Sequence, residues 1–219
     1  ETNLLRSKIL LISEKTEEGL DLYWQSLSTL QSSTDGDLFY RDLRYIMLDS
    51  EYDEYKSMSL TELPIFYSRF WHSRDPNLAT VVNERIAEHY KRLNHARKNF
   101  RRYESGYYNK VVIYKFEHPL YGIMNIKFGD DLIIPYATKA MAEKKDLDDR
   151  GLIYIRHGQP ENFAFSICEG CPQNLSWRYA ATPFRPELIF HFSKHSDVRG
   201  WYLESLPYTF RQRGDFGGM

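Results

Sequence analysis

Apolar residues recur at helical spacing through the first hundred residues of the chain. Between residues 17 and 31 they are three or four positions apart and share one helix face: Leu20, Tyr23, Trp24, Leu27 and Leu30. The polar segment 32–36, which contains a glycine, predicts a turn after this helix. A second apolar stripe follows it, at Phe39, Tyr40, Leu43, Ile46 and Met47.

Two further helices are predicted from their start signals. Ser59 and Glu62 have the spacing of a capping box, and four large apolar residues follow them, at Leu63, Phe66, Phe70 and Trp71. Asp75 and Pro76 offer an N-cap and a first-turn proline for the longest helix. The apolar stripe of that helix comprises Leu78, Val82, Ile86, Tyr90, Leu93 and Phe100.

The second half of the chain has the composition of strands. β-Branched and aromatic residues predict an antiparallel pair at 110–116 and 123–128, and 137–145 predicts a short helix. Four more strands are predicted at 152–156, 176–179, 187–192 and 201–204, with 188–192 central because it is almost wholly apolar. Helices followed by strands indicate an α+β fold, in which a helical N-terminal half packs on a mainly antiparallel sheet.

Hydropathy and the chain end bear on the compartment. The 219 residues have a mean hydropathy of −0.58, and no apolar run approaches the roughly 18 residues of a membrane-spanning helix. The sequence begins at Glu1 rather than at a methionine, which we interpret as the start of a mature portion of a longer precursor.

Charge argues against a nucleic-acid partner. The formal net charge is −1, whereas proteins that bind duplexes carry a strong positive excess. Basic residues do gather at Lys91, Arg92, Arg97, Lys98, Arg101 and Arg102. An RNA or phospholipid patch is one interpretation, but stacking aromatics are not interleaved, so we favour a solvated helix face and predict no specific nucleic-acid binding.

Arg156-His157-Gly158, after the predicted strand 152–156, resembles the histidine phosphatase signature. In that chemistry the imidazole attacks phosphorus while the arginine holds phosphoryl oxygens. The mechanism also needs a second histidine, and His191 and His195 are available downstream. However, only 61 residues follow Gly158 and they show no βαβ pattern. We therefore favour a structural interpretation, in which Gly158 and Pro160 shape a turn.

The cysteines, Cys168 and Cys171, form one close pair. If the protein is exported we expect a disulfide between them, and if it is cytoplasmic two reduced thiols. A zinc site would need His157, His191 or His195 to complete it. A redox motif would need a helix N-terminus after a strand, whereas Pro172 follows this pair and favours a loop. We predict neither a metal nor another cofactor.

A longer pattern runs in order from residue 70 to residue 161. It comprises Phe70-Trp71 with Arg74-Asp75-Pro76, Asn83-Glu84-Arg85, His89-Tyr90, Arg92, Ala96 and Phe100, then Asp149-Arg150-Gly151, the segment 152–156 and Gly158-Gln159-Pro160-Glu161. Together these resemble the GWxTD-domain family of bacterial proteins. The chain departs from that pattern where Lys145, Asp146 and Asp148 replace its glycine, tryptophan and threonine, so the resemblance is to a divergent member.

The resemblance implies a fold and a compartment more than a reaction. Its members are commonly exported or associated with the cell envelope, and no established activity carries over. It implies an N-terminal helical segment at 1–60 and a GWxTD-like α+β domain at 61–219. Structural roles are expected for Phe70, Trp71, Asp75, Pro76, Gly151, Gly158 and Pro160. The alternative for Arg150, Arg156 and Glu161 is that they line a ligand groove.

From these observations we expect a non-catalytic module that serves protein–protein interaction, or a structural role, in a bacterial envelope or secreted assembly. The many tyrosines and tryptophans agree with a protein partner, because such interfaces favour Tyr, Trp and Arg. The alternative is a small phosphate-binding hydrolase centred on Arg156-His157-Gly158. A cytoplasmic location remains the alternative to export.

Overall fold

The protein forms two compact units in a computed structural model, which describes residues 2–77, 79–80, 82–102, 139–142, 146–166, 172–183, 185–194 and 200–204. The helical unit comprises Glu1–His95 with Thr138–Met141, and the sheet unit comprises Ala96–Ala137 with Ala142–Met219. The compact units thus divide near residue 95, inside a helix. The predicted division at residue 60 follows the extent of the resemblance and stays a prediction.

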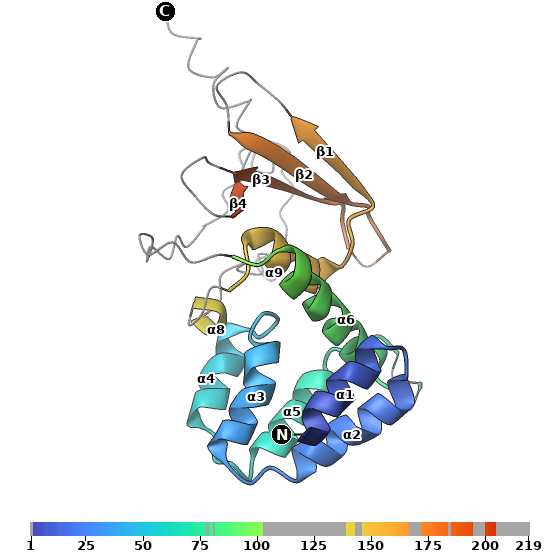
Figure 1. Cartoon of the computed structure of the whole chain (residues 1–219), viewed down its shortest axis with the longest axis vertical. Coiled ribbons are helices and arrows are strands. Elements are labelled where there is room, and N and C mark those ends of the chain that lie inside the picture. The colour runs from blue at the N-terminus through green and yellow to red at the C-terminus, as the bar shows by residue number, and fades with distance from the viewer. Residues whose placement is uncertain are drawn as a thin grey trace, which may run out of the picture. The chain divides into compact units, whose positions relative to one another are not determined.

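The helical unit contains α1 (Thr2–Ile12), α2 (Thr16–Ser28), α3 (Ser33–Leu43), α4 (Asp49–Ser57), α5 (Leu63–His72), most of α6 (Glu84–Asn99), and the start of α8 (Lys139–Ala142) (Figure 1). The predicted stripes face its interior: Leu20, Tyr23 and Leu27 of α2 are buried. Ser7 of α1 donates to the carbonyl of Gly19 at 2.7 Å, which joins the first two helices.

The segment 32–36 is a helix start rather than the predicted turn. The Ser32 side chain accepts from the backbone N–H of Asp35 at 3.2 Å, and Asp35 accepts from the backbone N–H of Ser32 at 3.1 Å. This reciprocal pair forms a capping box in which Asp35 takes the place of the more usual Glu, and α3 begins there. Polar residues that were interpreted as a turn therefore serve as a cap.

The predicted start of the longest helix at Asp75 and Pro76 is wrong. Asp75 instead accepts from the backbone N–H of Asn77 at 3.0 Å in a local turn, and Pro76 is exposed. α6 begins at Glu84, where Asn83 accepts from the N–H of Arg85 at 3.1 Å and donates to the carbonyl of Trp71 at 2.9 Å. Asn83 is as good a cap as Asp75, and it also ties α6 to α5.

Trp71 is fully buried, and its hydrogen bond and ring contacts lie within the helical unit. Its indole N–H donates to the Tyr23 hydroxyl at 2.8 Å, and edge-to-face ring contacts join it to Phe70 and His89. Desolvation raises the pKa of the Tyr23 hydroxyl above its ordinary value, so Tyr23 stays neutral. Trp71 therefore anchors α5 to α2 and α6.

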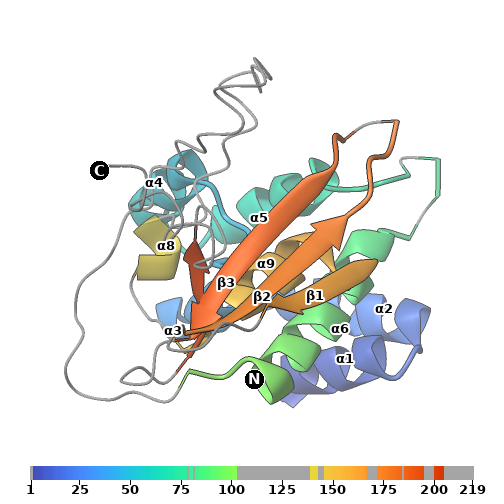
Figure 2. The same ribbon diagram turned by 90° about the horizontal axis from the view of Figure 1, so that it is seen from above.

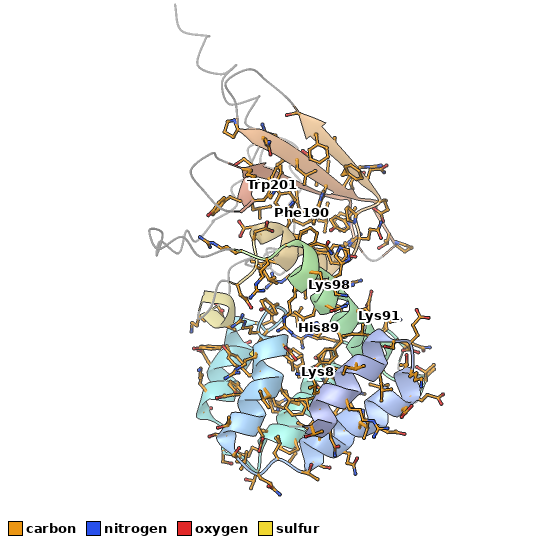
Figure 3. The ribbon with its side chains drawn as sticks, in the orientation of Figure 1. Lys8, His89, Lys91, Lys98, Phe190 and Trp201 are labelled. Carbon is orange, nitrogen blue, oxygen red and sulfur yellow. The ribbon has the colours of Figure 1, made fainter. Side chains whose placement is uncertain are left out.

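A charged pair lies in the same interior. Lys8 Nζ is 2.5 Å from Asp42 Oδ2, and the Asp42 side chain is only 4% exposed. The Nε2 atom of His89 lies 3.0 Å from the backbone carbonyl oxygen of Asp42. Figure 3 shows Lys8 and His89 inside the helical unit, so α1, α3 and α6 meet through polar as well as apolar contacts.

The sheet unit contains α9 (Asp149–His157) and a four-stranded antiparallel sheet in the order β1 (Asn162–Ser166), β2 (Gln173–Tyr179), β3 (Leu188–Lys194), β4 (Tyr202–Glu204) (Figure 2). The α+β class is therefore confirmed. β2, β3 and β4 match three of the four predicted strands, and β3 lies inside the sheet as predicted. The predicted strand at 152–156 is wrong, because these residues form most of α9.

The core of the sheet unit lies between α9 and one face of the sheet. Ile153 of α9 packs with a buried cluster from β2, β3, β4 and the residue before β4: Leu175, Trp177, Tyr179, Phe190, Phe192, Trp201 and Leu203. Trp177 opposes Phe190, and Phe192 opposes Leu203, so alternate residues of each strand fill this core. The predicted strands at 110–116 and 123–128 lie outside the described residues.

Truncating Trp71 should destabilise the helical unit strongly. Trp71→Ala removes a fully buried ring and should lower the free energy of unfolding by about 3–5 kcal/mol. Tyr23→Phe keeps the ring but leaves the indole N–H without its acceptor, and should lower it by about 1–3 kcal/mol. Urea unfolding measures both, and the exposed Ile65→Ala serves as control. A Trp71→Ala midpoint equal to that of the control would contradict the anchor role.

The α3 cap should make stability depend on pH. The Ser32 hydroxyl, which donates to Asp35, lowers the pKa of that carboxyl. A folded pKa below the unfolded value of about 3.9 means that the ionised cap stabilises the fold above that value, and that this contribution is lost as pH falls through the folded pKa. Asp35→Asn should therefore be less stable than wild type in urea at pH 7, and the difference should shrink at pH 3. A difference independent of pH would contradict the cap.

Candidate functional site

The carboxylate of Asp148 caps α9 and reaches toward β4. It accepts from the backbone N–H groups of Arg150 at 3.1 Å and Gly151 at 3.3 Å, two donors of the first helical turn. It also accepts from the backbone N–H of Trp201 at 3.3 Å, just before β4. Because Asp148 is only 4% exposed, these donors replace water around its charge.

The guanidinium of Arg150 completes this site. Its Nη2 lies 2.6 Å and its Nε 3.1 Å from Asp148 Oδ2. The same guanidinium lies 5.0 Å from the ring centres of Phe100 and Trp201, within range of cation–π attraction. Burial raises the pKa of Asp148, and the Arg150 pairing and the backbone donors oppose that shift. Arg150 thus pairs with Asp148 and lies within cation–π range of two rings of the sheet unit.

Asp149 adds hydrogen bonds between α9 and the β4 segment, and Gly151 allows close packing at the start of α9. The Asp149 backbone N–H donates to the Trp201 carbonyl at 3.1 Å, and its side chain accepts from the N–H of Leu203 at 2.8 Å. A Cβ on Gly151 would stand 3.0 Å from Leu147 Cβ and 3.2 Å from Phe100 Cβ, so the close packing leaves little room there. Residues 149–151 form the first turn of α9, and Arg150 pairs with Asp148.

Gly158 follows the last residue of α9 and forms its C-cap. Its φ of 83° lies in the left-handed region that favours glycine. Its N–H donates to the Tyr154 carbonyl at 2.8 Å, and its buried carbonyl accepts from the Tyr179 hydroxyl at 3.0 Å. The half-buried Pro160 lies in the short connection to β1. This geometry agrees with the structural roles expected for Gly158 and Pro160.

His157 lies in the last turn of α9 and not at the end of a strand. Its ring centre is 5.5 Å from that of Tyr179 and 5.3 Å from that of Phe190, so it packs on the core face of the sheet. Figure 3 shows Phe190 on this face. The strand that precedes Arg-His-Gly in the phosphatase signature is therefore a helix in this chain, which removes the main structural ground for that resemblance.

The second histidine needed for phosphoryl transfer lies on the wrong side. His191 follows Phe190 in β3, and successive strand residues point to opposite faces. Its Nδ1 is 2.8 Å from the hydroxyl of Ser176, its cross-strand partner on the outer face. The sheet thus separates His157 from His191, while His195 lies outside the described residues.

Arg150, Arg156 and Glu161 do not gather on one surface of α9. The two arginines are six positions apart, which places them about 120° apart around the helix and about 9 Å apart along it. Glu161 lies beyond Gly158, where its carboxylate accepts from the N–H of Ala180 and its own N–H donates to the Arg178 carbonyl at 3.1 Å. A ligand groove formed by these three side chains stays a prediction.

The described residues hold no group of three or more His, Cys, Asp and Glu side chains placed to bind a metal. Cys168 and Cys171 lie outside the described residues, so the disulfide stays a prediction. No described helix has the length and apolar character to cross a membrane.

Sequence reasoning missed two residues that the structure makes prominent. Phe163 and Phe165 of β1 are 66% and 61% exposed. The alternation of 162–166, Asn-Phe-Ala-Phe-Ser, is a period-two signal typical of a strand and was available in the sequence. The surrounding glycine and proline had been interpreted as a turn alone.

Removing the Asp148 carboxylate should destabilise the sheet unit. Asp148→Ala leaves Arg150 and three backbone N–H groups without their acceptor, and should lower the free energy of unfolding by about 3–5 kcal/mol. Asp148→Asn should be less severe, because asparagine still caps a helix but cannot pair with Arg150 as an ion. Urea unfolding followed by Trp fluorescence compares the two. Equal stability of wild type and Asp148→Ala would refute this assignment.

Comparison of the chain with models of protein families, with curated proteins and with solved structures found no match. Its function is therefore inferred from its own residues. Those that carry chemistry are Asp148, Arg150, His157 and Glu161, and each is engaged in contacts within the sheet unit.

Proposed function

We propose that this chain is a non-catalytic module of a bacterial envelope or secreted assembly, in which it binds another protein or serves a structural role. We further propose that it is a divergent member of the GWxTD-domain family. The observation that carries the proposal is that the signature residues Arg74 and Arg150 make internal contacts. Large apolar side chains away from the sheet, Leu5, Ile9 and Ile65, nevertheless remain on the surface.

Arg74, of the Arg-Asp-Pro signature, illustrates this internal use. Its guanidinium lies 3.7 Å from the ring centre of Phe70 and donates to both carboxylate oxygens of Glu51, at 2.8 and 2.7 Å. It also donates to the Ile46 carbonyl at 3.2 Å. With its planar face and its edge both occupied, Arg74 fixes the end of α5 against α4. A catalytic or anion-binding arginine would leave donors facing a cleft.

Asp148 supports the family resemblance even where the sequence departs from it. The family pattern has threonine at this position, and threonine and aspartate are both preferred N-cap residues. Asp148 caps α9 here, so the replacement preserves the local chemistry. The aspartate adds a charge, and Arg150 supplies the counter-charge two residues later.

The basic run at 91–102 is partly used within each unit, which supports the absence of a specific nucleic-acid site. Lys91 pairs with Glu14 at 3.4 Å, and Arg92 pairs with Glu88 one helical turn away. Arg102 donates to the Tyr202 hydroxyl at 3.3 Å, and its guanidinium lies 5.6 Å from that ring centre. Charges engaged in this way are less available to phosphates.

The proposal is tested by native isolation. A tagged chain expressed in its source cell is purified without detergent and with mild crosslinking, and co-eluting proteins are identified by mass spectrometry. We expect a stoichiometric protein partner and recovery in the envelope or secreted fraction. An exported protein of similar size with the same tag is the control.

Two results would overturn the proposal. One is recovery of this chain with no other protein at stoichiometric amount. The other is turnover of a phosphomonoester that is lost in His157→Phe, a variant that keeps an aromatic ring between Tyr179 and Phe190. Loss of a true nucleophile lowers the rate by several orders of magnitude.

A further inference from the structure

Among the described strands, β1 lies at one edge of the sheet and β4 lies at the other (Figure 2). The central residues of β1 are exposed, including Phe163 at 66% and Phe165 at 61%. The two rings contact each other edge to face, with centres 5.9 Å apart. Phenylalanine is ordinarily an interior residue, so a pair of rings on an edge strand marks a surface that is suited to association.

The register of the sheet shows which face these rings occupy. Phe163 opposes Trp177 and Phe165 opposes Leu175, and directly opposed residues point to the same face. Trp177 and Leu175 belong to the buried cluster under α9, whereas the two β1 rings are outside it. The apolar face of the sheet therefore continues past its helical cover onto β1.

β1 also lacks the features that usually protect a sheet edge. Natural edges carry charges, prolines or bulges that prevent another strand from pairing. The five residues of β1, Asn-Phe-Ala-Phe-Ser, contain no charge and no proline, and their pairing with β2 runs without a bulge. Within the part of the chain that the structure describes, β2 is the one strand paired with β1.

We propose that a second copy of this chain pairs with β1 in antiparallel orientation, across a two-fold axis at Ala164. In that register Phe163 of each copy opposes Phe165 of the other, and Asn162 opposes Ser166. Aromatic residues then meet aromatic residues on the apolar face, and small or polar residues meet on the outer face. The two sheets join into one sheet of eight strands, four from each copy.

Self-complementarity is the reason to choose a second copy over another partner. A two-fold interface requires a surface that matches itself, and the order Asn-Phe-Ala-Phe-Ser is symmetric about Ala164 in size and polarity. The strand has no charge that would face its own copy or select an oppositely charged partner. The short Ala164 side chain opposes itself at the axis, where a larger side chain would crowd its mate.

The exposed area sets the strength of the association. A phenylalanine side chain can bury about 200 Å², so the exposed parts of the two rings offer about 250 Å² per copy. A standard interface buries about 1,600 Å² in total. The rings and the strand edge supply less than that, so we expect a dimer that forms reversibly as protein concentration rises rather than a permanent one.

Charge reversal at the axis tests the register. Sedimentation velocity of the purified chain over a range of concentrations should show wild type shifting from monomer to dimer. Ala164→Lys places two lysines opposite each other, and Ala164→Glu places two glutamates, so each variant alone should stay monomeric. An equimolar mixture should dimerise again, because lysine then opposes glutamate. Ile65→Lys, at an apolar position 71% exposed in the helical unit, should associate as wild type does.

Three outcomes would overturn the inference. They are a wild type that stays monomeric at the highest soluble concentration, dimerisation unaffected by Ala164→Lys, and failure of the mixed variants to associate although each is folded by circular dichroism. Self-association is measured on the pure chain and the proposed function on a different protein partner. The failure of one therefore leaves the other standing.

Discussion

A buried carboxylate, that of Asp148, is the constraint on which the sheet unit depends. It lies where three segments meet: the residues after α6, the start of α9 and the approach to β4. Removing a charge from water is unfavourable unless donors replace the lost hydration, and here Arg150, Gly151 and Trp201 supply them. Because those donors come from different segments, satisfying one side chain sets the position of all of them.

In the helical unit, too, buried polar groups have partners that replace water, and these partners are neutral groups as well as ions. The Trp71 indole and the Tyr23 hydroxyl satisfy each other in an interior rich in aromatic rings, and Lys8 offsets the charge of Asp42. Large rings supply the buried apolar area, while their polar tips limit the arrangements that avoid an unsatisfied donor. The many tyrosines of the chain are explained in part by this interior, where Tyr23, Tyr45 and Tyr67 are fully buried.

The distribution of polar and apolar groups supports the proposal that this module binds another chain. The residues that suggested chemistry in the sequence have internal partners. Arg150 pairs with Asp148, His157 packs on the sheet, and Glu161 accepts from the backbone. Residues that looked ordinary, Phe163 and Phe165, are the exposed ones. A surface of this kind gains free energy when another chain covers it, whereas a reaction site needs polar groups that face a cleft.

The sequence by itself determined the class of the fold. Apolar spacing of three and four predicted the helices around Leu20 and Phe39, and β-branched and aromatic runs predicted β2, β3 and β4, because these patterns arise from each element having one face to bury. Capping signals did not fix where α6 begins, because Asp75 and Asn83 are both good N-cap residues. The hydrogen bond from Asn83 to the Trp71 carbonyl, a tertiary contact, favours Asn83.

Tertiary structure decided the rest. Leu152-Ile153-Tyr154-Ile155 has strand propensity, yet it is helical because Asp148 caps it and because Ile153 packs under the sheet; burial against a partner element outweighs the small intrinsic preference of each residue. The same holds for the candidate site. Whether Arg150, His157 or Phe163 meets solvent depends on which distant segments reach it, and no local pattern contains that information.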